Sequence, residues 1–414
     1  MVKVNLFDPA VQSCPYDAYQ TLRDDAPAYR CPATGMYVVT RFDDVRRVLT
    51  DPKTFSSRTQ RLRASARNSG RGAKVAALFE AEGWLPGATL AGRDDPEHRE
   101  MSAMFNEAFR PKKIKALDPE VRTLAFSLID DFIDAGRCDF VSAFAIPLPL
   151  IIIGRQMGAD PDDIWKIKDW THAFFRRISM MLPEDEELAT VRQEIEAQHY
   201  FQPIFERLRE RPNDTLLSEL VNSVIEQWGR PLTDNELHAE MMADTFVGGS
   251  ETTTNALSAG VKLLIEQPDV WAQLKGDPEA LVPVFLEEVL RLESPVQSLM
   301  RITTCDVEIG GSVIPADSLV NVRYGAANRD ERRFSEPEKL DLARERAGGH
   351  MAFGSGVHHC LGAPLARREL YWSFFALTQR IESMRFAAGA EFEYHPHYLL
   401  RSLKRLDIEF ERAG

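Results

Sequence analysis

Apolar residues recur every three or four positions through most of the middle of the chain, which is the spacing of one buried helix face. Residues 121–133 are an example, with apolar side chains at positions 121, 124, 125, 128, 129, 132 and 133. Short β-rich stretches lie nearer the ends, at 36–40, at 307–314 around Gly310-Gly311, and at 406–410. The pattern predicts a mainly α protein with small β-sheets.

No internal repeat, low-complexity tract or Gly/Ser linker divides the 414 residues. We therefore expect one large domain over residues 1–414, although the chain exceeds the usual span of a domain. Its helix-rich core is predicted at about 95–300 and 350–385, with β-rich portions near 30–60, 300–325 and 385–414.

One predicted helix is unusually long. Thr233-Asp234-Asn235-Glu236 has the form of a capping box, and apolar periodicity then runs from residue 237 to about residue 265. Gly248 and Gly249 lie near its middle, where each glycine costs about 1 kcal/mol relative to alanine. From spacing alone, either another helix crosses tightly here or some other group approaches the backbone.

Residues 61–93 are rich in Gly, Arg and Ala and show helical periodicity only at 75–79. Loops of this length are usually functional lids or disordered segments. Arginines in this segment form either a site for a substrate carboxylate or ordinary surface charge. They are Arg61, Arg63, Arg67 and Arg71.

Charge and composition narrow the function classes. The formal net charge of -13 opposes general phosphate binding, so we expect no nucleic-acid partner. No run of about 18 apolar residues and no signal-like N-terminus appears, which predicts a cytoplasmic protein without a membrane anchor. Five widely spaced cysteines without a Cys-x-x-Cys pair disfavour a disulfide framework.

Most of the chemistry is carried by one stretch, which reads HMAFGSGVHHCLGAPLARR from residue 350. Its glycines permit tight turns, and helical spacing resumes after Cys360, so this cysteine comes just before a helix N-terminus. Free amide groups and the helix dipole there stabilise a thiolate, the form that binds iron. A zinc site from His358, His359 and Cys360 is disfavoured, because adjacent residues project in different directions.

The spacing of this stretch resembles the haem-binding loop of the cytochrome P450 family. The matching residues are Phe353, Gly354, Gly356, His358, Cys360 and Gly362. The resemblance implies the family's single large, triangular-prism haem-thiolate fold and a soluble bacterial monooxygenase. It also implies heme b (iron protoporphyrin IX), with Cys360 as the axial metal ligand that favours O–O cleavage. Phe353 would then pack beside the sulfur, and His358 would hydrogen-bond a propionate.

Two further elements match the family upstream of the loop. Glu288 and Arg291, three residues apart on a predicted helix, would alone form an ordinary surface pair worth about 0.5 kcal/mol. By resemblance they belong to a buried structural network, with Arg344 as the candidate third member. Arg301 matches the arginine that pairs with a haem propionate.

The segment Gly248-Gly249-Ser250-Glu251-Thr252 matches the family's oxygen-activating sequence. By resemblance, the glycines leave room for dioxygen and substrate, Thr252 hydrogen-bonds the activated oxygen, and Glu251 relays protons to it. A lone Glu-Thr pair on a helix would otherwise be a solvated face.

A weaker match occurs at Asp95-Pro96-Glu97-His98, where the resemblance gives His98 to a propionate. The family commonly has Arg four residues later, where this chain has Ser102. The propionate would then be held by His98 alone or with another base such as Arg99.

The resemblance implies dioxygen, a lipophilic substrate (terpenoid, steroid, fatty acid or aromatic) and an iron-sulfur ferredoxin with its reductase. Basic residues that would meet the ferredoxin, or are merely solvated, are Lys112, Lys113, Lys115, Arg367 and Arg368. Apolar residues that would line the substrate pocket, or pack in the core, are Val247, Leu299, Met300, Phe174, Phe175, Met180, Met181, Leu399 and Leu400.

Two other functions share this resemblance. A peroxide-driven peroxygenase typically has Arg and Pro in place of the acid and threonine, so Glu251 and Thr252 argue against it. A haem protein that binds or senses without turnover has no need of the same pair. The sequence therefore favours a monooxygenase.

Overall fold

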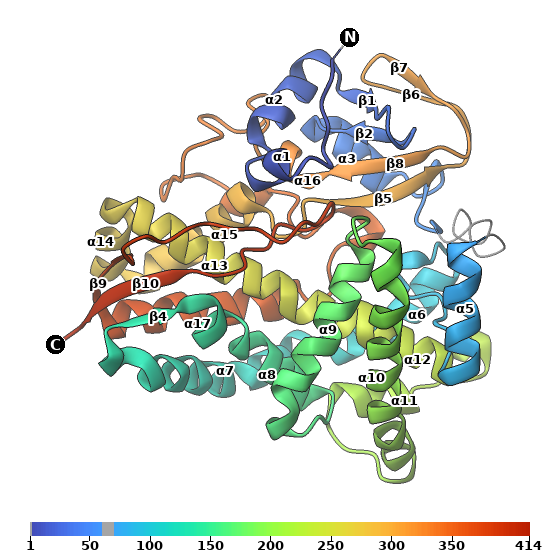
Figure 1. Cartoon of the computed structure of the whole chain (residues 1–414), viewed down its shortest axis with the longest axis horizontal. Helices are drawn as coiled ribbons and strands as arrows, with labels where there is room; N and C mark the ends of the chain where they lie inside the picture. The colour runs from blue at the N-terminus through green and yellow to red at the C-terminus, as the bar shows by residue number, and fades with distance from the viewer. Residues whose placement is uncertain (1, 60–69) are drawn as a thin grey trace.

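The computed structural model describes residues 2–59 and 70–414. Figure 1 shows a mainly helical body, with the N-terminal strands and the strands drawn in orange at the top and the C-terminal strands at the left. The mainly α class with small sheets is confirmed. In the described part of the chain, no helix combines the length and the apolar character that a membrane crossing requires.

The largest sheet joins the N-terminal region to residues 298–323. Its strand order is β1-β2-β8-β5-β3. The strands are β1 (Ala28–Arg30), β2 (Tyr37–Val39), β3 (Phe55–Ser56), β5 (Ser298–Thr303) and β8 (Leu319–Arg323). Val38 of β2 is in parallel register with Asn321 of β8. Because this sheet needs both parts of the chain, we propose that they belong to one domain.

Two smaller sheets contain the β-rich stretches predicted at 307–314 and 406–410, although one of their strands, at 137–139, lies in a region predicted to be helical. β6 (Val307–Ile309) and β7 (Ser312–Ile314) form a hairpin around Gly310 and Gly311, whose φ angles of 55° and 77° suit such a turn. The third sheet has the order β4-β10-β9, formed by β4 (Arg137–Asp139), β9 (Ile381–Phe386) and β10 (Asp407–Arg412).

Helices make up the rest of the fold. In chain order they begin with α1 (Pro9–Ser13), α2 (Tyr16–Asp25), α3 (Phe42–Thr50), α5 (Arg71–Glu82), α6 (Glu97–Ala108), α7 (Pro111–Phe132), α8 (Pro147–Gln156) and α9 (Ile164–Ile178). They continue with α10 (Glu184–Glu210), α11 (Leu216–Asn222), α14 (Pro268–Gly276), α15 (Pro278–Glu293), α16 (Tyr324–Ala327) and α17 (Ala363–Arg380).

The long central helix follows the predicted path but changes its winding. It consists of α12 (Asp234–Glu240), the π-helical segment η6 (Met241–Glu251) and α13 (Thr252–Glu266), and the Thr233–Glu236 capping box is present. Apolar spacing predicted α geometry throughout, whereas the middle of the helix has the wider π turn. Such turns are rare in proteins, and those that occur are often found at functional sites. The glycine pair lies in this segment, where α geometry is least favoured.

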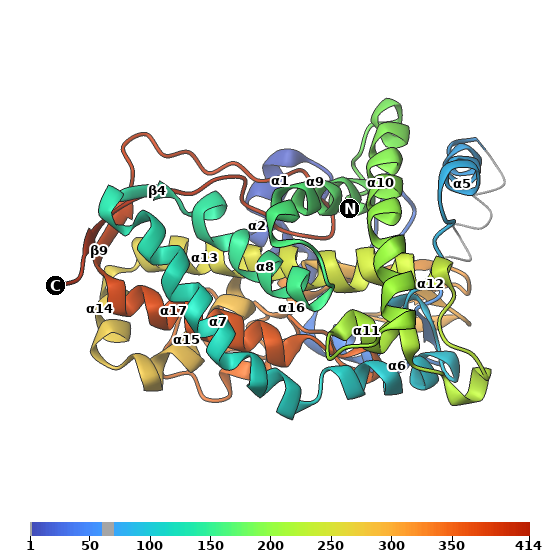
Figure 2. The ribbon, with the colours of Figure 1, turned by 90° about the horizontal axis from the view of Figure 1, so that it is seen from below.

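The helices that carry the sequence motifs pack on one another. In Figure 2, α17 lies below α13 and between α7 and α15. Phe374 of α17 approaches Gly260 of α13 so closely that a β-carbon there would lie 2.4 Å from the ring. The tight helix crossing therefore occurs at Gly260, one element away from the Gly248-Gly249 pair.

The Gly- and Arg-rich segment is partly helical. Residues 71–82 form α5, which is longer than its periodicity indicated. Arg71 pairs with the carboxylate of Glu187 and donates to the Leu182 carbonyl, so its charge already has a partner. Arg61, Arg63 and Arg67 lie outside the described residues.

Candidate active site

The cysteine loop is pressed against α3 by two glycines with left-handed backbone. Gly354 and Gly356 both have φ of 72°. A β-carbon at Gly356 would lie 2.4 Å from the Leu49 carbonyl oxygen, so only glycine fits there. Cys360, whose amide donates to the Phe353 carbonyl at 3.0 Å, is held two residues before Gly362, the N-cap of α17.

The sulfur of Cys360 lies in a recess that favours a cation. Burial raises the pKa of the thiol more than the amides of Gly362 and Ala363 lower it, and Asp244 of η6 raises it further. Helix-end amides alone therefore do not secure the thiolate, contrary to the simplest expectation from sequence. Cys360 nevertheless has accessible surface, so open space adjoins this residue. A metal cation in this space would stabilise the thiolate.

Three predicted propionate-binding residues come together from three parts of the chain. The rings of His98 and His358 have centroids 4.1 Å apart. Burial, and then Arg301, lowers the pKa of His358 to about 3, and Arg301 also lowers that of His98. His358 Nε2 lies 2.9 Å from the hydroxyl of Ser57, a partner that the sequence did not indicate.

Arg301 lacks an acidic partner within the described part of the chain. Its side chain is 5% exposed, and NH1 donates to the Met300 carbonyl at 2.8 Å. A buried guanidinium without an anion costs several kcal/mol. The cluster of Arg301, His98 and His358 therefore fits an anionic group such as a carboxylate, and haem propionates have this chemistry.

The departure at Ser102 has a simple structural outcome. Ser102 donates its hydroxyl to the Arg99 carbonyl at 3.2 Å. The side chain of Arg99 is exposed, whereas His98 is buried. His98 is thus the member of this helix that faces the cluster.

Glu288, Arg291 and Arg344 form one buried network. Arg291 donates to both carboxylate oxygens of Glu288, at 2.7 and 3.0 Å, and both side chains are fully buried. Arg344 Nε lies 2.9 Å from Glu288 Oε1. Arg291 also donates to the carbonyls of Asn328, Pro337 and Lys339, so it ties α15 to the chain before the cysteine loop.

The neighbouring carboxylate, Glu287, was missed by motif reasoning. It accepts from His350 at 2.9 Å and from Arg367 at 2.6 and 3.1 Å. Burial raises its pKa, but these hydrogen bonds lower it overall to about 2. The Arg367 guanidinium lies 4.5 Å from the centroid of the Phe353 ring, so this ion pair braces the cysteine loop.

The oxygen-activating segment has an unexpected partner. Glu251 is 3% exposed and is paired with Lys168 of α9, 83 residues earlier in the sequence. Thr252 donates its hydroxyl to the Gly248 carbonyl at 2.7 Å. A β-carbon at Gly249 would make only an ordinary contact, 3.5 Å from Ile153, so tight packing does not explain the glycine pair.

The apolar residues proposed for a substrate pocket do not form one group. Phe175 is 1% exposed and packs on the His397 ring, with centroids 4.3 Å apart. Val247 and Leu400 are also buried. Others lie elsewhere: Met300 and Leu399 pack against the N-terminal cluster, Met181 accepts from Gln12, Phe174 lies under Arg177, and Leu299 and Met180 are exposed.

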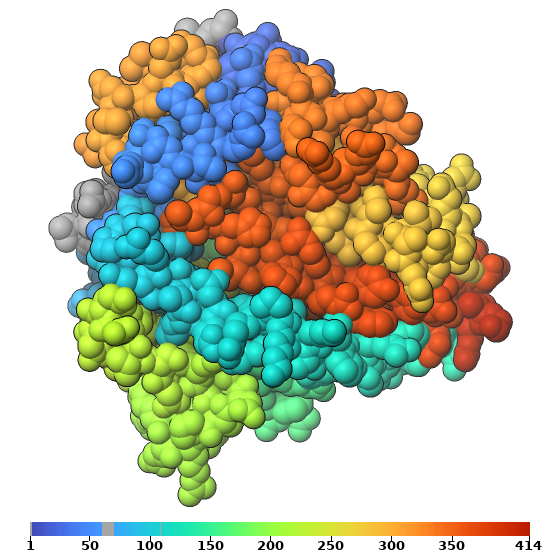
Figure 3. All heavy atoms as spheres, turned by 180° about the vertical axis from the view of Figure 1, so that it is seen from behind, coloured from blue at the N-terminus to red at the C-terminus, as the bar shows by residue number. Residues whose placement is uncertain are grey.

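The proposed basic face is partly neutralised. Lys113 pairs with Glu219, Arg367 with Glu287 and Arg368 with Asp118. Lys112 and Lys115 are exposed and have no ion-pair partner in the described part of the chain. Figure 3 shows α7 beside the segment that leads into α17 on this face of the molecule.

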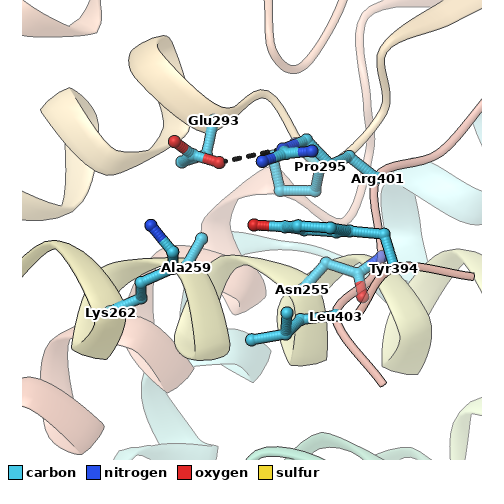
Figure 4. Close-up of a pocket in the computed structure, with 8 residues that line it drawn as sticks. All are labelled: Asn255, Ala259, Lys262, Glu293, Pro295, Tyr394, Arg401 and Leu403. Atoms are coloured by element: carbon cyan, nitrogen blue, oxygen red, sulfur yellow. Dashed lines mark hydrogen bonds and ion pairs between the residues drawn. The ribbon is translucent and has the colours of Figure 1, made fainter. Parts of the chain in front are cut away.

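A small polar cavity borders α13 beyond the active segment. It has a volume of about 10 Å³, room for a single water, and is lined by eight residues, shown in Figure 4. Asn255, four residues after Glu251, is 4% exposed, and its amide oxygen and nitrogen find no hydrogen-bond partner in residues 2–59 and 70–414. Tyr394 and the Glu293–Arg401 pair close the other side.

The comparisons with known proteins agree with this geometry. Residues 162–387 match the family model described as Cytochrome P450. Nocardicin C N-oxygenase of Nocardia uniformis subsp. tsuyamanensis is 34% identical over 401 residues, 95% of each chain. Cytochrome P450 monooxygenase PikC of Streptomyces venezuelae is 33% identical over 406 residues, 96% of this chain and 92% of that protein.

Solved structures give the same result. Cytochrome P450 CYP109Q5 from Chondromyces apiculatus superposes with a TM-score of 0.85 at 29% identity, covering 99% of this chain and 98% of that one. The family membership that the sequence motifs predicted is thereby confirmed, and the similarity extends over nearly the whole chain. The protein belongs to the cytochrome P450 family and is an oxidoreductase of the monooxygenase type.

Proposed function

We propose that this chain is a cytoplasmic monooxygenase that hydroxylates a lipophilic small molecule with dioxygen and two electrons from an iron-sulfur ferredoxin and its reductase. One observation carries the proposal: buried Arg301, which has no acidic partner in the described residues, lies beside His98 and His358, and a Cys360 thiolate likewise needs a neighbouring cation. A haem supplies both missing charges, because it has anionic propionates and a central iron.

The residues present fit heme b. Cys360 would bind the iron, while Arg301, His98 and His358 would hold the propionates. Gly248 and Gly249, which are not filled by close packing, would leave space on the opposite side. Bound there, the thiolate-ligated haem supplies the redox chemistry that cleaves the O–O bond.

The protein's own contribution on the oxygen side is proton handling. Glu251, which is buried and paired with Lys168, lies next to Thr252 in the sequence. The Thr252 hydroxyl donates to the Gly248 carbonyl, and by rotating it can donate to bound dioxygen instead. General acid catalysis by positioned groups of this kind contributes about 10²- to 10⁴-fold.

This arrangement favours dioxygen over peroxide as oxidant. A peroxygenase, or a haem sensor without turnover, makes no use of a buried carboxylate that must be paired with Lys168 at a desolvation cost of several kcal/mol. For the electron donor, exposed Lys112 and Lys115 beside the approach to α17 supply the positive charge that an acidic ferredoxin would meet.

The absorption spectrum of the reduced, carbon monoxide-treated protein tests the proposal. We expect a strongly red-shifted Soret band in the wild type, which Cys360→His loses while retaining haem. A histidine-type band in the wild type, or no haem band, would exclude thiolate ligation by Cys360.

A further inference from the structure

Two histidines lie beside the Glu251–Lys168 pair, outside every motif described above. His172 follows Lys168 by four residues on α9, so both side chains leave the same face of that helix. His395, from the segment between β9 and β10, meets it with ring centroids 5.1 Å apart and an interplanar angle of 61°. Both rings are half-buried, and Glu251 acts electrostatically on each.

Backbone hydrogen bonds hold the segment that carries His395 and join it to the residue that follows α9. The His395 amide donates to the Ser402 carbonyl at 2.9 Å, and the nearby Tyr398 amide donates to the Ser179 carbonyl at 3.0 Å. Both ring nitrogens of His397, two residues later, already have hydrogen-bond partners. Nε2 lies 3.1 Å from the Phe175 carbonyl, and Nδ1 accepts from the amides of Leu399 and Leu400. The rings of His172 and His395, in contrast, make no hydrogen bond within the described residues, so their nitrogens can accept or donate a proton.

The surroundings keep both rings neutral near pH 7. Burial lowers the pKa of His395 to about 4, helped by His172, Lys168 and Lys404 and opposed by Glu251. Burial also lowers the pKa of His172, with Lys168 and Arg176 acting in the same direction and Glu251 and Asp169 against it. A neutral imidazole has one donor and one acceptor nitrogen, which is the form that passes a proton on.

We propose that His172 and His395 form the entry route by which solvent protons reach Glu251. A proton binds the acceptor nitrogen of one ring, and the proton on the other nitrogen leaves inward. The ring is left as its other tautomer, and reorientation with proton exchange to solvent resets it before the next cycle. Each cycle delivers one proton to the Glu251 carboxylate and moves no electrons. This inference rests on the proposed function, which consumes those protons.

The Asn255 cavity is the competing route. It borders α13, its lining includes Tyr394, the residue before His395, and it holds about one water. Asn255→Leu would remove its polar wall and leave both histidines in place.

The test uses the holoenzyme without organic substrate, so that dioxygen is the probe. NADPH, a plant-type ferredoxin and its reductase supply electrons for O₂ + 2e⁻ + 2H⁺ → H₂O₂, and peroxide formation is measured in H₂O and in D₂O. We expect the double variant His172→Phe/His395→Phe to be about tenfold slower, with a larger solvent isotope effect. Glu251→Gln should be slowed at least as much. His199→Phe, on the exposed face of α10, should match the wild type.

The carbon monoxide spectrum of each variant separates the possible failures. A wild type without the thiolate band would overturn the proposed function itself. With that band present, slowing by Glu251→Gln or Asn255→Leu but not by the histidine variants would overturn the histidine route, as would no slowing in any variant. If the double variant loses haem, peroxide formation is measured with His395→Gln instead. We expect this variant to be slower than the wild type and to have a larger solvent isotope effect. A wild-type rate and a wild-type isotope effect would contradict the proposal.

Discussion

The two sides of the candidate site are built in different ways. On the cysteine side, the loop, its glycines, the Glu288–Arg291 pair and Arg344 were identified from sequence motifs, although partners such as Glu287 and Arg367 are 80 residues apart. On the oxygen side, Thr252 and Glu251 lie in a motif, but Lys168, His172 and His395 come from distant parts of the chain. The charged partners on the cysteine side lie in or next to sequence motifs, whereas Lys168, His172 and His395 lie in none.

This difference predicts separate consequences. Changes on the cysteine side should affect stability and haem content, because its ion pairs are buried and already satisfied within the protein. Changes on the oxygen side should leave the folded holoprotein intact and alter only the use of electrons and protons. The following variants test that division.

The largest effect is expected for Arg291→Ala. It leaves the fully buried Glu288 carboxylate without its main partner, which should cost about 3–5 kcal/mol and prevent stable haem incorporation. Denaturant unfolding and haem content measure this. Arg412→Ala, which removes an exposed pair with Asp134, is the control and should cost less than about 1 kcal/mol. Stable holoprotein from Arg291→Ala would show that the network is dispensable.

A pH effect should follow from Glu287. Its pKa of about 2 lies below the ordinary 4.5, so its contribution is present above pH 4.5 and is lost as pH falls towards 2. The shift corresponds to about 3 kcal/mol at most. Glu287→Gln should therefore flatten the fall in unfolding free energy between about pH 5 and pH 3, and exposed Glu336→Gln should not. Parallel curves for wild type and Glu287→Gln would contradict the assignment.

Gly356→Ala separates close packing from backbone strain. Left-handed φ alone costs about 1 kcal/mol for alanine, and the clash with the Leu49 carbonyl should bring the total to about 2–3 kcal/mol. Gly389→Ala has φ of 77° with no atom within 4 Å, so it measures the strain alone. Equal unfolding free energies for the two variants would mean that the loop moves away from α3 easily.

The smallest free-energy effect is expected for Thr252→Ala. Stability and the carbon monoxide spectrum should match the wild type, since the hydroxyl bonds only within its own helix. Product formed per NADPH should fall about tenfold, or 1.4 kcal/mol, with hydrogen peroxide released instead. The measurement uses a substrate that the wild type hydroxylates. Full coupling in the variant would remove Thr252 from proton handling.

Sequence reasoning reached the parts of the molecule whose physics is local. The Thr233 capping box, the hairpin at Gly310-Gly311 and the position of Cys360 before α17 depend on neighbouring residues and could be predicted. The π winding of η6 could not, because apolar spacing does not distinguish it from α geometry. Lys168 gave no signal, since nothing near it in sequence indicates a partner 83 residues away.

The prediction of substrate-pocket residues is also limited, because it rests on apolar character and not on tertiary contacts. Phe175 and Phe174 are adjacent and equally apolar, yet Phe175 is buried on His397 while Phe174 lies under Arg177. Side chains of this kind serve core or ligand equally well. Only the tertiary neighbours decide between the two roles.

The parallel pairing of β2 with β8 has a consequence for synthesis in the cell. Val38 and Asn321 are 283 residues apart in the sequence, so the N-terminal strands emerge long before their partner exists. At about 5–20 residues per second, translation leaves β2 waiting roughly 15–60 s with an unpaired edge. The N-terminal region should therefore complete its folding late, and a nascent chain stalled before residue 319 should keep residues 28–56 sensitive to protease.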